Sequence, residues 1–386
     1  MLGAALHLRP DHPEALNTLG AMAAGSADPE EAIAWFEDAL EAAPGNLAAQ
    51  YNLAQVLFLV GDYARGFDLL RARQMLLFGR ANQLDPMPAW RGENLAGKHL
   101  FVWCDWGGLG DHLQFIRYVA LLRERARPAR LTLGVGRELA ALFAAIPCVD
   151  AVSEPGHAPR ADVHSPLLDL PHLFGTGIDS VPASMPYLAA ISAQVAPWGE
   201  RLQVAGLPER GPSPGQTRDR DLRVGLAWKS TGSANEVQVY QQMRRSKSVP
   251  PPLLAPLRLP GVHFVSLQIG ADAAECAATG LNPIDCTAEI TDFAATAAVI
   301  AQLDLVISAD TSVAHLAGAM GKPVLLLLRR ESGMFWLQER EDSPWYPTMR
   351  ILRQEQSGDW APVIAQAARW LERAAAEGVQ VVMPRA

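Results

Sequence analysis

Two stretches of this sequence alternate short apolar runs with helical patterns, and this alternation constrains the fold more than any other feature. The first covers residues 95–198 and the second residues 222–356, and a segment rich in Gly, Pro, Arg and Asp at 199–221 separates them. Short apolar strands that alternate with helices indicate parallel, doubly wound sheets. We therefore predict an α/β protein with two Rossmann-like domains that are joined by a linker and face a cleft. Ligands of such sheets bind at the carboxyl ends of the strands, so the cleft is the expected site.

Residues 1–78 have a different pattern, which is helical and repeats. Three pairs of like residues recur after 34 residues, namely Pro10 and Pro44, Leu19 and Leu53, and Asp28 and Asp62. This is the period of the tetratricopeptide repeat (TPR), a helix–turn–helix unit, although a plain helical cap explains the same residues. Such repeats need about three copies for independent stability. We therefore expect this segment to pack against the next domain, or to continue repeats that lie upstream.

Composition argues against several classes of function for the 386-residue chain. A net charge of −8 leaves no basic footprint for nucleic acid. The four cysteines form no CxxC pair, which fits neither a disulfide framework nor a zinc site. The apolar runs are far shorter than the roughly 20 residues that span a bilayer, and the first residues lack the pattern of a signal peptide. These features predict a cytoplasmic protein with no transmembrane segment and no nucleic-acid partner.

The segment "VISADTSVAHLAGAMGKPVLLL" contains the strongest candidate for a binding site. Asp310 follows an apolar strand and is well placed as the N-cap of a helix that begins at Thr311. The backbone N–H groups of Thr311, Ser312 and Val313 would then point into the cleft with the positive end of the helix dipole behind them. This arrangement binds phosphate or diphosphate groups. A helix cap without any ligand is the alternative.

Cations for a phosphate group are available after the strand at 222–229. Lys229 stands at the end of that strand, and the following loop carries Arg245 and Lys247. We expect Lys247 or Arg245 to reach the phosphates, with Lys229 as the second choice; a solvated basic loop is the alternative. One turn into the helix after Asp310, His315 is placed either to contact a sugar or phosphate oxygen or simply to pack in an Ala-rich helix.

A second candidate is the glycine-rich turn in "WCDWGGLGDHLQFIRY". Three glycines let the backbone turn sharply and keep the site free of side-chain bulk, at positions Gly107, Gly108 and Gly110. A dinucleotide fingerprint would need a third glycine where Leu113 stands, so the pattern argues against it. The acid that follows the turn, Asp111, is either a structural helix cap or a functional group.

The chain resembles the bacterial TPR glycosyltransferases, which are relatives of the heptosyltransferases (glycosyltransferase family 9) and distant relatives of the O-linked N-acetylglucosamine transferases. The resemblance covers nearly the whole chain and is carried by "GGLGDHLQFIRY", "VGLAWK", "FVSLQIG", "DTSVAHLAGAMGKPV", "DSPWYPTMRILRQ" and "GDW". It implies the GT-B fold, with TPR hairpins at 1–78, an acceptor domain at 95–198 and a nucleotide-sugar domain at 222–356. It also implies that the last segment, 357–386, packs back on the N-terminal α/β domain.

The same resemblance implies a glycosyltransferase that moves a sugar from a nucleotide-diphosphate donor to a hydroxyl acceptor by inverting displacement. Asp111 would be the catalytic base, because a carboxylate at the lip of the cleft can take the proton of the attacking hydroxyl. Gln268 would lie beside the nucleoside, and the TPR region would recruit an acceptor glycan or protein. Two alternatives stay open, a GT-B-fold sugar-nucleotide epimerase or hydrolase and a non-catalytic TPR scaffold.

We predict no metal and no cofactor. Asp219-Arg220-Asp221 has the DxD spacing that holds a divalent cation in another class of glycosyltransferases, but it lies in the hydrophilic linker. The scattered His and Cys residues have no metal-ligand spacing.

Overall fold

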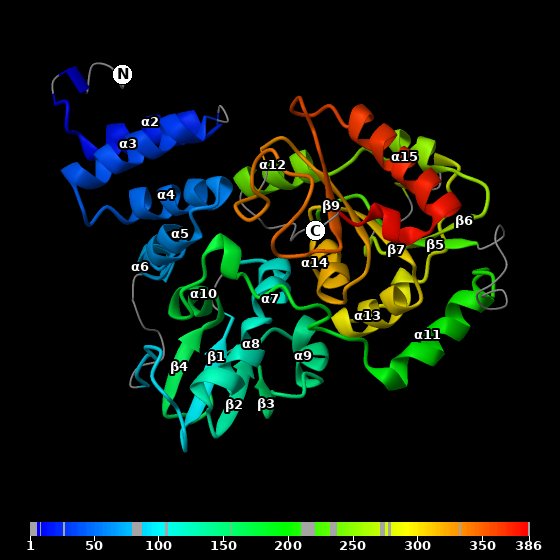
Figure 1. Ribbon diagram of the computed structural model, residues 1–386, viewed down its shortest axis with the longest axis horizontal. Helices are drawn as coiled ribbons and strands as arrows, with labels where there is room; N and C mark the ends of the chain where they lie inside the picture. The colour runs from blue at the N-terminus through cyan, green and yellow to red at the C-terminus, as the bar shows by residue number, and fades with distance from the viewer. Residues whose placement is uncertain are drawn as a thin grey trace.

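The computed structural model describes residues 6–7, 9–25, 28–78, 87–104, 107–154, 156–209, 221–231, 238–270, 275–276, 279–331 and 333–384. A helical segment is followed by a smaller and then a larger α/β domain, and the three parts lie against one another (Figure 1). Among the helices of these residues, none combines the length and the apolar character that a bilayer crossing requires.

Successive helices of the N-terminal segment pack side by side (Figure 1). They are α2 (Pro13–Gly25), α3 (Pro29–Ala42), α4 (Leu47–Val60), α5 (Tyr63–Leu70) and α6 (Ala72–Phe78). The recurrence of Asp28 and Asp62 has a structural reason, because each caps the second helix of a pair by accepting a backbone N–H three residues on. Small residues allow the close packing, since a Cβ added at Gly20 would lie 2.6 Å from the ring of Phe36. The structure thus shows helical pairs, and their identity as TPR units stays a prediction.

The second helical pair packs on the body of the protein, as expected. Tyr63 and Phe67 belong to the same buried cluster as the first α/β domain. The hydroxyl of Tyr63 accepts a hydrogen bond of 3.0 Å from Nε1 of Trp345, and the carbonyl of Leu59 accepts one of 3.1 Å from the backbone N–H of Gln338. Whether further repeats precede this segment stays a prediction.

The first α/β domain is built on a four-stranded parallel sheet in the order β3-β2-β1-β4. Its strands are β1 (His99–Trp103), β2 (Arg130–Gly134), β3 (Ala151–Ser153) and β4 (Val163–Pro166). Its helices are α7 (Leu109–Phe115), α8 (Tyr118–Leu121), η1 (Leu122–Ala126), α9 (Arg137–Ala144), η2 (Leu167–Asp169), α10 (Leu170–Leu173) and η3 (Ile178–Ser180). Helix α7 begins beyond the carboxyl end of β1, so the predicted strand–glycine turn–helix order is present.

The second α/β domain is built on a five-stranded parallel sheet in the order β6-β5-β7-β8-β9. Its strands are β5 (Leu222–Ala227), β6 (Val262–Ser266), β7 (Leu305–Ala309), β8 (Val324–Leu328) and β9 (Met349–Arg353). Its helices are α12 (Gln238–Lys247), η4 (Pro251–Leu257), η6 (Thr287–Glu289), α13 (Phe293–Ala301), α14 (Ser312–Ala319), α15 (Ala361–Glu377) and η7 (Val379–Val382). Strands β5, β7 and β8 are buried along their whole length, which is why they read as continuous apolar runs.

One predicted boundary, the start of the linker at residue 199, differs from the structure. The helix α11 (Ser192–Val204) runs through the start of the expected linker at 199–221, because its buried Trp198 and Leu202 pack it against the core. Residues 210–220 of that linker lie outside the described residues.

The C-terminal helix also differs from the expectation, since α15 does not return to the first α/β domain. Its apolar face packs on η4 and the second sheet. This face lies in one core cluster with Val224 of β5 and Ile307 of β7, and consists of Val363, Ile364, Ala367, Ala368, Leu371 and Ala374. The second sheet thus offers α15 an apolar surface in its own domain, where the helix becomes buried.

Candidate functional site

Helices α7 and α14 come from different domains and pack against each other with their first turns (Figure 1). A Cβ added at Gly110 of α7 would lie 2.7 Å from Cδ2 of His315 on α14. Because α7 follows the end of β1 and α14 follows the end of β7, the carboxyl ends of the two sheets face one another here. This is the place where ligands of parallel sheets bind.

Asp111 lies in the first turn of α7, where it acts as a cap. Its Oδ2 accepts a hydrogen bond of 2.6 Å from the backbone N–H of Gly108, and the side chain is half-buried. Gly107 has a φ of 98°, and a Cβ there would lie 2.6 Å from the same oxygen. The cap fixes the direction of the carboxylate. Burial lowers the pKa of His315, and Asp111 lies close enough to that imidazole to act against this lowering. Capping therefore does not exclude a functional role.

Asp310 is not the N-cap of α14, and that prediction is wrong. Helix α14 begins at Ser312, with Thr311 in the cap position. The carboxylate of Asp310 instead lies 2.7 Å from Nζ of Lys247 and accepts a hydrogen bond of 3.0 Å from Nε1 of Trp336. The cation and the indole N–H give this buried carboxylate two charge-assisted interactions.

The electrostatic state of Asp310 follows from these partners. The residue is 8% exposed, and burial by itself would raise its pKa. Lys247 and His315 outweigh burial and hold the pKa of Asp310 below its ordinary value. The carboxylate is therefore charged at neutral pH and holds Lys247 in place.

The backbone N–H groups at the start of α14 remain available. The first helical bond of this turn runs from Ala314 N to Thr311 O, at 3.1 Å. Among the described residues, we find no acceptor for the amides of Thr311, Ser312 and Val313. Available amides at a helix N-terminus, beside Lys247, form an arrangement that binds anions.

His315 packs beneath the same site and is 8% exposed. Its Nδ1 is 2.9 Å from the hydroxyl of Tyr346, and its Nε2 is 4.0 Å from Oδ1 of Asp310. Burial lowers the pKa of His315, while Asp310 and Asp111 act in the opposite direction. The imidazole is thus a buried, hydrogen-bonded group that touches the acid of one domain and lies beside the acid of the other.

The remaining predicted site residues are Arg245, Lys229 and Gln268. Arg245 is exposed on α12. Lys229 stands beyond the end of β5 and pairs with Glu275 at 3.0 Å. Gln268 is buried, and its Oε1 accepts the backbone N–H of Lys229 at 2.9 Å and that of Trp228 at 3.2 Å. Gln268 therefore shapes the end of β5, and its predicted contact with a nucleoside stays a prediction.

Sequence reasoning missed Trp336 of this cluster, whereas Tyr346 lies in the segment "DSPWYPTMRILRQ" that helps to carry the family resemblance. It also missed Arg329, which directly follows β8, and Arg353 at the end of β9; both lie close enough to Asp310 to interact with its charge. A signal for the two arginines was available, since carboxyl ends of parallel strands line the ligand site. Trp336 had no such signal, because its loop reaches the site only through the fold.

The predicted absence of a metal stays a prediction. Asp219 and Arg220 lie outside the described residues, and Asp221 is 3.4 Å from Nε2 of His263. Within the described ranges, we find no group of three His, Cys, Asp or Glu side chains that could hold a metal ion.

Comparisons with known proteins point to one family. Residues 265–358 match the family model of glycosyltransferase family 9 (heptosyltransferase). The chain is 30% identical over 404 residues to Protein FlbA of Caulobacter vibrioides, with 96% of this chain and 63% of FlbA covered. The chain thus spans less than two thirds of the length of this curated relative.

The similar solved structures include the following two. One is the crystal structure of the glycosyltransferase family 9 protein from Veillonella parvula DSM 2008, with a TM-score of 0.55 and 13% identity over 76% of this chain and 99% of that chain. The other is the ADP-heptose heptosyltransferase II of E. coli, with a TM-score of 0.48 and 13% identity over 72% of this chain and 100% of that chain.

The Veillonella comparison shows the fold, which is an α/β fold with parallel sheets of the GT-B-like kind. The relation to the O-linked N-acetylglucosamine transferases stays a prediction. The family match includes Gln268, Asp310 and His315, and it supports sugar transfer as the chemistry. The chain is therefore similar in fold to glycosyltransferase family 9, and the segment that forms one side of the α7–α14 site matches the model of that family.

Proposed function

We propose that this protein transfers a sugar from a nucleotide-diphosphate donor to a hydroxyl acceptor, by a single inverting displacement that needs no metal. One observation carries the proposal. The first turn of α7, with Asp111, faces the first turn of α14, with its available amides and the Lys247–Asp310 pair. A base and an anion site thus stand on opposite sides of one domain interface.

The anion site fits the leaving group. In the proposed reaction the diphosphate lies at the amides of Thr311, Ser312 and Val313, and Lys247 turns from Asp310 toward a phosphate oxygen. The bond between the anomeric carbon and the diphosphate oxygen breaks, and the electron pair leaves with the diphosphate. Because the amides are fixed and Lys247 turns when the donor binds, they stabilise the developing charge without further reorganisation as the bond breaks.

Asp111 fits the acceptor side. Its Oδ2 is held by Gly108, so the other carboxylate oxygen is the one that accepts the proton of the acceptor hydroxyl. The acceptor oxygen then forms the new bond to the anomeric carbon from the face opposite the leaving group. His315 interacts with the charges of both acids, Asp310 and Asp111.

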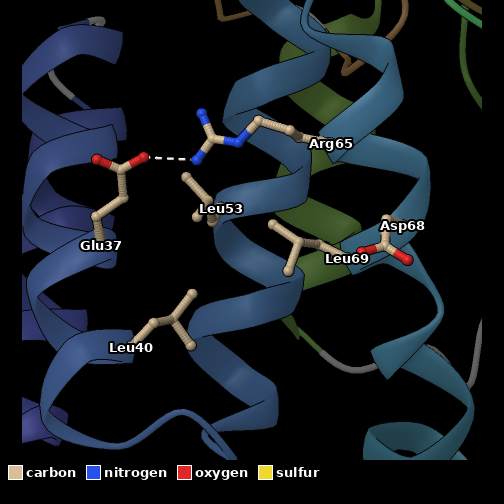
Figure 2. A pocket seen from close by; sticks show the side chains of 6 residues that line it. All are labelled: Glu37, Leu40, Leu53, Arg65, Asp68 and Leu69. Atoms are coloured by element: carbon tan, nitrogen blue, oxygen red, sulfur yellow. Dashed lines mark hydrogen bonds and ion pairs between the residues drawn. The ribbon is translucent and has the colours of Figure 1, made fainter.

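The helical segment is proposed to recruit the acceptor, either a glycan or a protein. Its support is a cavity of about 250 Å³ between α3, α4 and α5, in which the ion pair of Arg65 and Glu37 lies above leucine side chains (Figure 2). The lining residues are Glu37, Leu40, Leu53, Arg65, Asp68 and Leu69.

The expected cytoplasmic location of the protein stays a prediction.

The first test is titration calorimetry of the protein with UDP, ADP and GDP. The proposal expects one of these nucleoside diphosphates to bind without added metal and in the presence of a chelator. If none of them binds, the donor site is refuted, and the non-catalytic scaffold becomes the better explanation.

The second test replaces Asp111 by Asn, which keeps the size of the side chain and removes the base. We expect kcat to fall by about 10²- to 10⁴-fold while the affinity for the nucleoside diphosphate changes little. The measurement is nucleoside-diphosphate release from a nucleotide sugar, with and without a cell extract as the source of acceptor. Release that depends on the extract separates transfer from an epimerase or hydrolase.

Asp179→Asn is the matched control for that test, because Asp179 is an exposed acid in the same domain. It should leave kcat unchanged. Equal activity of Asp111→Asn and Asp179→Asn would show that Asp111 only caps α7.

A further inference from the structure

A further strand, β8, ends near the anion site, and Arg329 follows its last residue. The neighbouring strand β7 leads to Asp310, and the side chain of Arg329 is half-buried. Its Nη1 donates a hydrogen bond of 2.7 Å to the hydroxyl of Ser246. Ser246 precedes Lys247, whose Nζ is 2.7 Å from Asp310. Arg329 therefore belongs to the same cluster as the two residues that define the anion site.

Positive charge exceeds negative charge in this cluster. Lys247, Arg329 and Arg353 all interact with the single buried carboxylate of Asp310. Burial lowers the pKa of the Arg329 guanidinium, whereas Asp310 and Glu331 act in the opposite direction. Asp310 and Glu331 together leave one of these three cations without a matching negative charge. A half-buried surplus of positive charge favours the binding of an anion.

Arg329 also has N–H donors for which we find no acceptor among the described residues. A guanidinium has five N–H donors, and for Arg329 the bond to Ser246 is the one we find among the described residues. Its Nε is shielded from solvent and has no acceptor in the described part of the chain. A shielded donor without a partner costs free energy, and a charged oxygen acceptor would remove that cost.

We infer that Arg329 is a further donor-binding residue, which acts beside Lys247 and binds a second oxyanion of the nucleotide sugar. This oxyanion is either the distal phosphate of the donor or a carboxylate on its sugar, since both match the planar fork of a guanidinium. The inference rests on the proposed function, because it requires a nucleotide-sugar donor at the start of α14.

The neighbouring Arg330 offers a matched control. It carries the same charge, but it is exposed and its guanidinium donates to the carbonyl of Glu355. Ser246→Ala offers a second control, because it removes the hydrogen bond between α12 and Arg329 and leaves the cation in place. The two controls separate an effect of charge in general, and an effect of α12 packing, from binding by Arg329 itself.

The experiment is titration calorimetry of the wild type, Arg329→Gln, Arg329→Lys, Arg330→Gln and Ser246→Ala. The probes share the base that binds and are the nucleoside monophosphate, the diphosphate, a neutral hexose nucleotide and a hexuronate nucleotide. Binding of the diphosphate should weaken about 10- to 100-fold in Arg329→Gln if the phosphate is the partner. If the sugar carboxylate is the partner, the same loss should appear for the hexuronate nucleotide alone. The monophosphate should bind nearly as before in both cases.

Arg329→Lys keeps the charge and should lose less than Arg329→Gln, and both controls should bind like the wild type. Equal binding of all probes by the wild type and Arg329→Gln would overturn the inference and leave the proposed function intact. A loss of the same size in Ser246→Ala would also overturn it, because Arg329 would then act by holding α12. If the wild type binds none of these nucleotides, both the proposed function and the inference fail.

Discussion

At the scale of single residues, the site depends on which partner each charged group has. Asp310 follows a strand and precedes a helix in the sequence, and this position predicts an N-cap. The fold instead gives its carboxylate Lys247 from α12 and Trp336 from the loop after β8. Local sequence therefore marked Asp310 as a candidate but could not show its partners, because these come from segments remote in the chain.

At this scale, the burial of His315 can be tested through the pH dependence of the free energy of unfolding. Its pKa is lowered by burial from an ordinary value of 6.5, so below pH 6.5 the unfolded chain takes up a proton that the folded protein does not. The free energy of unfolding should be fully retained above pH 6.5 and should decrease as the pH falls below it. His315→Asn should remove part of that decrease. Urea unfolding at about pH 7.5 and about pH 5.5 measures the difference.

His164 also has a pKa that burial lowers, so the wild-type slope has more than one source. The control is His157→Asn, which replaces an exposed histidine and should leave the slope unchanged. A slope in His315→Asn equal to that of the wild type would contradict the prediction.

At the scale of elements, the contact of α7 with α14 sets the spacing between the two halves of the site. The alternating pattern predicted the strands that precede these helices, and the apolar runs placed them well because buried parallel strands leave a strong signal. The destination of α15 could not be predicted in the same way. The sequence shows that one face of this helix is apolar, but it does not show which of the two sheets buries that face.

Gly110→Ala tests the helix contact. The new Cβ would meet the imidazole of His315 at 2.7 Å, so this side chain or the two helices must shift, and we expect a loss of about 1–3 kcal/mol in stability together with reduced activity. Gly108→Ala is the matched control, because its φ is −86° and its Cβ would meet only Oδ2 of Asp111, at 3.8 Å. Urea unfolding and nucleoside-diphosphate release measure both variants. Equal losses of stability and activity in the two variants would show that the close contact of Gly110 with His315 is not their cause.

At the scale of the whole molecule, buried polar contacts join parts that are distant in the sequence. The guanidinium of Arg117 donates to the carbonyl of Trp345 at 2.7 Å and to the hydroxyl of Tyr187 at 2.9 Å. Trp345 in turn reaches Tyr63 of the helical segment. From the small number of repeats, the sequence predicted that this segment packs against the following domain. It could not identify Trp345 as the meeting point, because no local pattern marks an aromatic residue of a loop for that role.

A double-mutant cycle of Tyr63→Phe and Trp345→Phe tests this junction. Tyr63→Phe leaves the indole N–H of Trp345 buried without its acceptor, which should cost about 1–3 kcal/mol of stability. The double variant should cost less than the sum of the single variants, since the second change removes a donor that has already lost its partner. Urea unfolding followed by circular dichroism gives all three values. Strictly additive costs would show that the hydrogen bond contributes nothing to the junction.

The packing of α5 also limits how the chain can be divided. One side of this helix lines the cavity of Figure 2 with Arg65 and Leu69, and its other side covers Phe115 and Phe335 through Phe67. A protein shortened to start at residue 87 would uncover those rings, and exposed aromatic surface of this kind promotes aggregation. The helical segment is thus no removable appendage, because it completes the hydrophobic interior of the two domains beside it.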